Sequence, residues 1–197
     1  MTTARLHGNP LPGRPLLVVA LEIEAEHLHV HDHPILVTGL GKVNAAVGVA
    51  EALARVRPSL VINLGTAGAL RGHMEGTHEV TLVKQHDLNN ESILALTGVW
   101  PGTDIRVQPA PLPGDIVLTT GDDFVSDPVK AAALGLSAHL VDMEGYAVAR
   151  AAQSFDVPVR VVKTVSDRAD TGAVRSWQST MIQCSEALGL WVAENLG

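Results

Sequence analysis

Short apolar runs alternate along the chain with longer segments whose apolar residues recur at helical spacing. The runs that predict strands are residues 15–23, 34–40, 59–65, 78–85, 115–121, 139–143 and 157–166. Helical spacing predicts helices over 42–56, near 127–135, from Glu144 onward and over about 174–195. At most two helical turns fit between the first strand and His33-Pro34, and residues 88–113 predict a long surface excursion. This alternation predicts an α/β protein of three layers, with helices on both faces of a mainly parallel, mixed sheet.

Composition supports this prediction and excludes several kinds of partner. The 197 residues suggest one domain, 1–197, and the 46% hydrophobic and 18% charged residues argue against disorder. Only 3% are aromatic, so Val, Leu, Ala and Ile must build the core, as in sheets buried on both faces. A net charge of −7 disfavours nucleic acid and anionic membranes as partners. A single cysteine, Cys184, and the lack of a visible targeting or membrane-spanning segment predict a cytoplasmic protein.

Polar residues follow the ends of several predicted strands, where ligands of parallel sheets bind. They are Glu22 and Glu24, Gly65-Thr66-Ala67-Gly68, His86-Asp87, Asp142 and Glu144, and Ser166-Asp167. An edge with several acids and small residues suits a neutral polyol or nucleoside better than a phosphate. Trp177 either belongs to the core or covers this edge.

Two other motifs have a plainer interpretation. "TGLGKVNAA" (38–46) resembles a dinucleotide-binding loop, but Asn44 replaces the third glycine and no strand-end acid follows about 20 residues on. We therefore interpret it as tight strand-to-helix packing, with no NAD. "HLHVHDHP" (27–34) contains four histidines, but spacing fixes no further metal ligand beside them. We interpret it as a polar connector, so no metal or other cofactor is predicted.

Six segments in order resemble the 5′-methylthioadenosine/S-adenosylhomocysteine nucleosidases, within the larger nucleoside phosphorylase superfamily. They are "VVALEIEAE", "VTGLGKVNAAVGVAEAL", "PSLVINLGTAGAL", "GDIVLTTGDDF", "VDMEGYAVA" and "VVKTVSDRAD". The resemblance covers most of the chain from residue 16 onward. It implies a nucleoside phosphorylase-like fold, a homodimer, a role in methionine salvage, and hydrolysis of a purine nucleoside without a cofactor.

The resemblance also implies catalytic roles. Asp167 would be the general acid that protonates the purine, and Ser166 would orient it. Glu24, rather than Glu22, would activate the water that attacks the sugar. The reaction would pass through an oxocarbenium-like state, as in glycoside hydrolysis by two carboxylates.

The same family pattern implies the substrate contacts. Glu144 would bind the ribose hydroxyls, with Met143 against the sugar; Phe124 would stack on the adenine, and the backbone of Val125 would bind the base edge. Thr66 and Lys163 would line the water site, in the turn that includes Ala67 and Gly68, although the family usually has Arg where this chain has Lys163. Trp177 falls near the 5′ substituent.

Two features favour hydrolysis over phosphorolysis. The phosphorylases have an arginine just before the "G-[ST]-x-G" turn, where this chain has Asn63-Leu64, and the acidic "LEIEAE" replaces their phosphate loop. The chain is shorter than typical members between Glu24 and Gly39 and over 88–113, which form part of the 5′ pocket and dimer contact in the family. Methylthio, homocysteinyl, 5′-deoxy and futalosine substrates therefore all stay open, as do phosphorolysis and a non-catalytic nucleoside-binding protein.

Overall fold

The computed structural model describes residues 4–72, 74–102, 104–107 and 115–196. Its strands are β1 (Arg5–His7), β2 (Pro15–Val19), β3 (Ile35–Val37), β4 (Leu60–Ala69), β5 (Thr77–Val80), β6 (Leu82–Gln85), β7 (Ile105–Arg106), β8 (Val117–Thr120), β9 (Leu140–Asp142) and β10 (Val159–Asp167). Its helices are α1 (Glu22–Ala25), α2 (Lys42–Arg55), α3 (Asn90–Thr97), α4 (Pro128–Gly135), α5 (Gly145–Ser154) and α6 (Ala173–Leu196).

One mixed sheet forms the middle layer. Its order is β1-β3-β2-β4-β9-β8-β6-β7, and β10 pairs with both β4 and β5. Parallel pairs join β2 to β3, β2 to β4, β4 to β10, β6 to β8 and β8 to β9, whereas β9 meets the end of β4 antiparallel. The prediction of a mainly parallel, mixed sheet is therefore confirmed.

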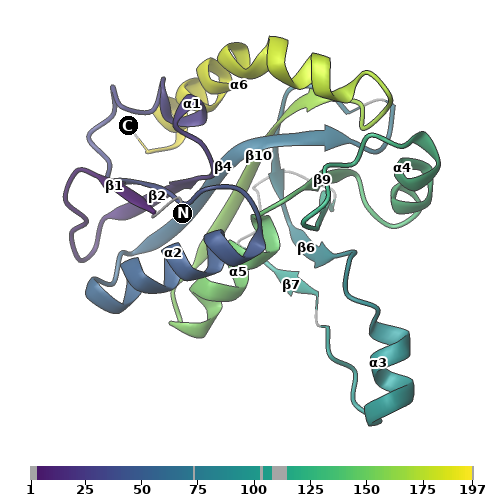
Figure 1. Cartoon of the computed structure of the whole chain (residues 1–197). Helices are drawn as coiled ribbons and strands as arrows, with labels where there is room; N and C mark the ends of the chain where they lie inside the picture. Colours follow the sequence, from purple (N-terminus) through teal and green to yellow (C-terminus); the bar gives the residue numbers. More distant parts are fainter. Residues whose placement is uncertain (1–3, 73, 103, 108–114, 197) are drawn as a thin grey trace.

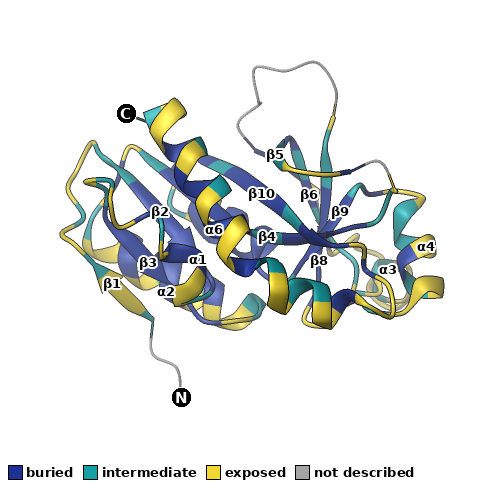
Figure 2. Cartoon of the chain, turned by 90° about the horizontal axis from the view of Figure 1, so that it is seen from above, coloured by how far each residue is buried: buried dark blue, intermediate teal, exposed yellow. Residues whose placement is uncertain are grey.

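Helices cover both faces of the sheet, as predicted. In Figure 1, α6 lies over one face, α2 and α5 lie over the other, and α3 projects away from the body. The strands alternate accordingly: Leu16 and Val18 of β2 pack in the cluster that contains α2 and α5, whereas Leu17 and Val19 pack in the cluster that contains α6. Both faces of β2 are therefore buried, which explains its uninterrupted apolar sequence. Figure 2 shows the same pattern as a dark blue sheet beneath a partly exposed α6.

The boundaries differ from the predictions in several places. β4 continues to Ala69, beyond its predicted end at residue 65, and β3 ends at Val37, before its predicted end at residue 40. The run 15–23 ends as a strand at Val19, because the Glu24 carboxylate accepts hydrogen bonds from the backbone N–H groups of Ala20 and Leu21 and the chain turns into α1. The run 78–85 is divided between β5 and β6, which pair with different neighbours. The excursion 88–113 contains α3 and β7, although residues 103 and 108–113 of it lie outside the described residues. β1 was not predicted from the polar N-terminal segment.

The long strand β4 positions the cavity described next. Its first part lies between β2 and β10, and its last residues, Gly68 and Ala69, pair with β9. The ends of β4, β9 and β10 therefore meet in one place. None of the helices within the described ranges is long and apolar enough to cross a membrane.

Candidate active site

A cavity of about 310 Å³ lies where β4, β9 and β10 meet. Its volume is within the range of small-molecule sites. Of the predicted site residues, these line it: Glu24, Thr66, Ala67, Gly68, Phe124, Val125, Met143, Glu144, Ser166, Asp167 and Trp177. Sequence reasoning did not assign seven further lining residues to it: Ala20, Leu21, Leu40, Asp123, Val141, Val174 and Gln178. The first five lie within the quoted family segments, whereas no motif marks Val174 and Gln178. The structure thus brings eleven of the twelve predicted residues together, and Lys163 is the exception.

Glu24 is held at one end of the cavity by backbone donors. Its Oε2 accepts hydrogen bonds from the N–H groups of Ala20 and Leu21, both at 3.0 Å. Its Oε1 accepts from the N–H of Thr66 at 2.9 Å and from the Thr66 hydroxyl at 3.3 Å. The indole N–H of Trp177 donates in turn to that hydroxyl at 3.2 Å. These donors fix the orientation of a carboxylate that is only 5% exposed.

Asp167 is the last residue of β10 and lies opposite Gly68 of β4. A register shift between Val165 and Asp167 leaves Ser166 as an extra residue in β10. Successive residues of a regular strand point to opposite faces, but a bulge redirects them. Ser166 and Asp167 consequently both line the cavity, and the Ser166 hydroxyl donates to Asp167 Oδ2 at 2.8 Å.

The environment of Asp167 favours its protonated form. Burial raises the pKa of this carboxyl above its ordinary value. Hydrogen bonds from the Ala169 N–H and the Ser166 hydroxyl oppose this rise without cancelling it. Asp167 is therefore more readily protonated near neutral pH than an exposed aspartate.

Glu144 connects the cavity to a distant loop. It precedes α5 as the N-cap residue, and its Oε1 accepts a hydrogen bond from the N–H of Gly41 at 2.8 Å. Gly41 has a φ of 90°, a conformation that favours glycine. The glycines of "TGLG" thus shape a loop that contacts Glu144, which agrees with the interpretation that this motif is not a dinucleotide site.

Lys163 lies beneath the cavity and does not line it. The side chain is fully buried, and its Nζ pairs with Asp142 Oδ2 at 2.8 Å. Asp142 also accepts hydrogen bonds from the Thr120 hydroxyl at 2.6 Å and the Gly145 N–H at 2.8 Å. This set of donors satisfies the Asp142 carboxylate, which itself forms part of the cavity wall.

The charges around Lys163 affect one another. Burial alone would lower the pKa of Lys163, but the carboxylates of Asp142, Glu144 and Glu24 outweigh this effect and raise it. Burial, with the nearby charge of Asp142, raises the pKa of Glu144 to about 8. Three acids thus surround one ammonium group, so the site favours a cationic ligand or transition state and disfavours an anion.

The glycines of the "GTAGAL" segment were expected to lie in a turn, but they lie in β4. A Cβ at Gly65 would lie 3.1 Å from Glu24 Oε1 and 3.2 Å from Lys163 Nζ. A Cβ at Gly68 would lie 3.0 Å from Asp167 Oδ1. These two glycines therefore make room for the carboxyl groups of Glu24 and Asp167.

Replacing Gly68 by Ala is therefore expected to displace Asp167 and to reduce turnover by about 10–100-fold, because small displacements of reacting groups are costly. A steady-state assay of the nucleoside hydrolysis that the family resemblance implies would measure this loss. The control is Gly72→Ala, because a Cβ there meets no heavy atom within 4 Å among the described residues. Equal activity of both variants would contradict the close packing assigned to Gly68.

Two predicted strand-end groups do not line the cavity. Glu22 points away from it and contacts His7. Asp87 is engaged by Lys42 and by the backbone N–H of Asp122, and neither it nor His86 reaches the cavity. The prediction that all these groups share one site is wrong for Glu22, His86 and Asp87.

Comparisons with known proteins agree with this architecture. The 5′-methylthioadenosine/S-adenosylhomocysteine nucleosidase of Bacillus thuringiensis (strain Al Hakam) is 29% identical over 176 residues, covering 76% of this chain and 74% of that protein. A crystal structure of the Helicobacter pylori enzyme of that name, with butyl-thio-DADMe-Immucillin-A, has a TM-score of 0.79 at 20% identity and covers 93% of this chain and 97% of its own. The futalosine hydrolase of H. pylori strain 26695 has a TM-score of 0.77 at 20% identity, covering 92% and 96%.

The structural neighbours confirm the predicted nucleoside phosphorylase-like fold. A family profile described as "Phosphorylase superfamily" matches residues 22–116 and 115–194. These two matches together span most of the sequence. The chain belongs to the phosphorylase superfamily.

Proposed function

We propose that the protein hydrolyses the N-glycosidic bond of a 5′-modified purine nucleoside of the methylthioadenosine or S-adenosylhomocysteine type. The observation that carries this proposal is that Glu24 and Asp167, two buried carboxyl groups, line one cavity. Glu24 contacts β4 at Thr66, and Asp167 lies opposite Gly68 of the same strand, two residues further on.

In this reaction Asp167 donates its proton to a ring nitrogen of the purine. The bond between the base and the anomeric carbon breaks, and its electron pair leaves with the base, which departs neutral. The raised pKa of Asp167 supports this role, since an acid must hold its proton at the working pH. The Ser166 hydroxyl and the Ala169 N–H orient the carboxyl group.

Glu24 accepts a proton from the attacking water molecule. The oxygen of this water bonds to the positively charged anomeric carbon, and the product is a free ribose derivative. Hydrogen bonds from the backbone of Ala20, Leu21 and Thr66 hold the Glu24 carboxylate in place before the reaction begins. Such preorganisation costs no rearrangement in the transition state.

Glu144 binds the ribose hydroxyls in this proposal. Gly41 fixes one of its oxygens, and Met143 lies beside it in the cavity wall. Positive charge that develops on the sugar favours the ionised form of Glu144, so these hydrogen bonds strengthen as the transition state forms. In this proposal Phe124 and Val125, which also line the cavity, contact the purine base.

The charge of the cavity supports water rather than phosphate as the nucleophile. None of the lining residues in the described part of the chain is Lys or Arg, and three acids surround the buried Lys163. An incoming phosphate would meet carboxylates without a compensating cation. The positive sugar of a hydrolytic transition state meets the opposite, favourable environment.

Incubation of the purified protein with methylthioadenosine, S-adenosylhomocysteine, 5′-deoxyadenosine, futalosine and inosine tests the proposal. We expect release of adenine and a free ribose derivative from at least one 5′-modified adenosine in phosphate-free buffer. Strict dependence on phosphate would instead make the protein a phosphorylase. Binding of these nucleosides without any product would make it a nucleoside-binding protein. Base release from futalosine alone would make futalosine the substrate in place of a 5′-modified adenosine.

The pH dependence provides a further prediction. The acid must be protonated, so base release is expected to fall as pH rises through the raised pKa of Asp167. A pH–rate profile of kcat/KM measures this alkaline limb. Ionisation of Glu144, whose pKa is raised to about 8, would instead strengthen the ribose contacts as pH rises, so the profile of Glu144→Gln is the control. If Glu144→Gln no longer showed the fall in kcat/KM at alkaline pH, that fall would be due to Glu144, which would contradict its assignment to Asp167.

A further inference from the structure

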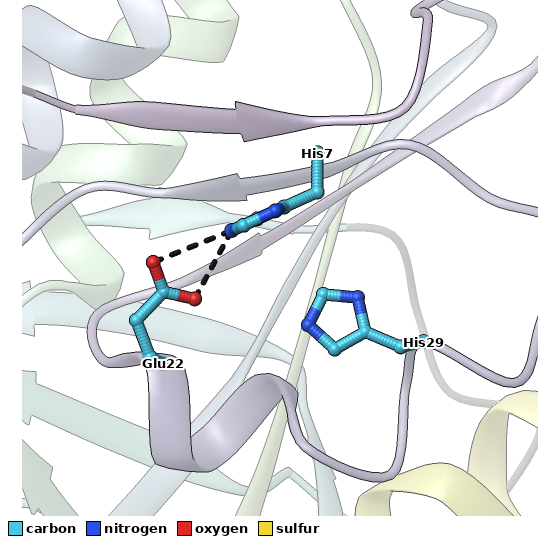
Figure 3. A group of neighbouring side chains, drawn as sticks. All are labelled: His7, Glu22 and His29. Atoms are coloured by element: carbon cyan, nitrogen blue, oxygen red, sulfur yellow. Dashed lines mark hydrogen bonds and ion pairs between the residues drawn. The ribbon is translucent and has the colours of Figure 1, made fainter.

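Three side chains from separate segments converge on the surface, outside the cavity. Figure 3 shows His7 at the end of β1, Glu22 at the first turn of α1 and His29 in the connection after α1. One ligand atom from each residue lies within 4.8 Å of the other two. His7 Nε2 is 3.0 Å from Glu22 Oε2, and the rings of His7 and His29 have centroids 5.0 Å apart in an edge-to-face arrangement at 81°.

We propose that His7, Glu22 and His29 bind a divalent transition-metal ion such as Zn²⁺. Two imidazole nitrogens and one carboxylate oxygen are a donor set that zinc accepts, with a water molecule as the fourth ligand. Bonds of about 2.0–2.2 Å to a tetrahedral ion place its ligands roughly 3.3–3.5 Å apart. His7 Nε2 lies 3.3 Å from Glu22 Oε1, which meets this requirement. The exposed His29 has a ring nitrogen within 4.8 Å of the other two ligand atoms and must move closer to them to bind the same ion.

One neighbouring charge opposes the ion. Arg5 Nη1 lies 3.5 Å from Glu22 Oε1, with 71% of the Arg5 side chain exposed. An exposed ion pair of this kind contributes little free energy, and the long side chain is free to move into solvent. A metal ion would therefore replace a weak contact of Glu22 with a stronger one.

The histidine-rich tract by itself does not form this site. His27 Nδ1 lies 3.2 Å from the Ser185 hydroxyl, and His31 Nε2 lies 3.0 Å from the carbonyl oxygen of Gly189. Both of these histidines contact α6, whereas His29 meets His7 and Glu22. The proposed site thus takes one ligand, His29, from the tract that the sequence analysis interpreted as a polar connector, and its other two ligands come from elsewhere in the chain.

The ion would connect three parts of the fold. β1 is the edge strand of the sheet, and α1 follows β2 and carries both Glu22 and Glu24. Glu24, two residues after the proposed ligand Glu22 in the sequence, lines the cavity. Bound metal is thus expected to raise the thermal unfolding temperature, because it binds the folded arrangement and not the separated segments.

Calorimetric titration of the metal-free protein with zinc chloride tests the site. The full chain should be used after removal of any purification tag and of contaminating metal with a chelator. We expect one ion per chain, and binding weakened by about tenfold or more in His7→Ala, His29→Ala and Glu22→Gln. The control His33→Ala removes an imidazole from the same tract but outside the cluster, so its affinity should stay within about threefold of the parent value.

A second readout is independent of stability and activity. Co²⁺ bound in a tetrahedral site gives visible absorption bands, which should be present in the parent protein and His33→Ala and absent from His29→Ala. Circular dichroism of each metal-free variant establishes that it is folded. Absence of saturable one-to-one binding, or an equal loss of affinity in His33→Ala, would overturn the proposal.

Discussion

Replacing Asp167 by Asn is expected to reduce base release by about 10³-fold, within the 10²–10⁴-fold range of general acid catalysis. The amide has nearly the same shape and still accepts a hydrogen bond from the Ala169 N–H, but it has no proton of suitable acidity to donate. Binding of the nucleoside should change little, since the ribose contacts proposed for Glu144 are intact. Single-turnover measurements of base release, with a separate binding titration, distinguish the two effects.

Asp170→Asn is the matched control for this substitution. Asp170 is an exposed acid in the segment after β10, and its Oδ1 accepts a hydrogen bond from the Gly172 N–H at 2.8 Å, which an asparagine can also accept. Among the influences on the pKa of Asp167, the charge of Asp170 is the smallest. Its turnover should stay within about threefold of the parent value, as expected for a surface change. Near-normal turnover of Asp167→Asn would remove Asp167 from the role of general acid.

Replacing Lys163 by Met is expected to lower the free energy of unfolding by about 3–5 kcal/mol, the cost of removing one partner from a buried ion pair. The substitution leaves Asp142 without its ammonium partner among the further acids Glu144 and Glu24. Chemical denaturation monitored by circular dichroism measures the change. Combining Lys163→Met with Asp142→Asn should recover part of the loss, because the uncompensated charge is then removed.

Lys84→Met is the control for position 163. Lys84 Nζ lies 3.3 Å from Asp104 Oδ2, but the side chains are 29% and 53% exposed. Its removal should therefore cost about 0–1 kcal/mol. A comparable cost for both lysines would show that burial of the Lys163–Asp142 pair has no special effect on stability.

The layers of the fold were predictable because the buried apolar residues recur at a different spacing along a helix than along a strand. β2 is apolar on both faces, and α2 begins and ends within one residue of its predicted bounds. The end of β2 was not predictable in the same way. The turn after Val19 depends on hydrogen bonds to Glu24, and an acid five residues after the end of a strand does not by itself predict such a turn.

The lining of the cavity was predicted better than the contacts beneath it. Strand-end positions and the family pattern placed Glu24, Glu144 and Asp167 together, and the structure brings them to one cavity. The burial of Lys163 against Asp142 was missed, because a lysine within an apolar strand gives no indication of whether its amine reaches solvent. The partner of Gly41 is 103 residues away, at Glu144, and no local pattern encodes so distant a contact.

The bulge in β10 has a consequence for protein design. Neighbouring residues 166 and 167 cooperate only because one extra residue interrupts the strand, so that a hydroxyl and an acid adjacent in sequence share one side of the sheet. Copying Ser-Asp into an ordinary strand of another scaffold would separate the two groups onto opposite surfaces. A designer who wishes to transplant this acid must also transplant the irregularity of the backbone.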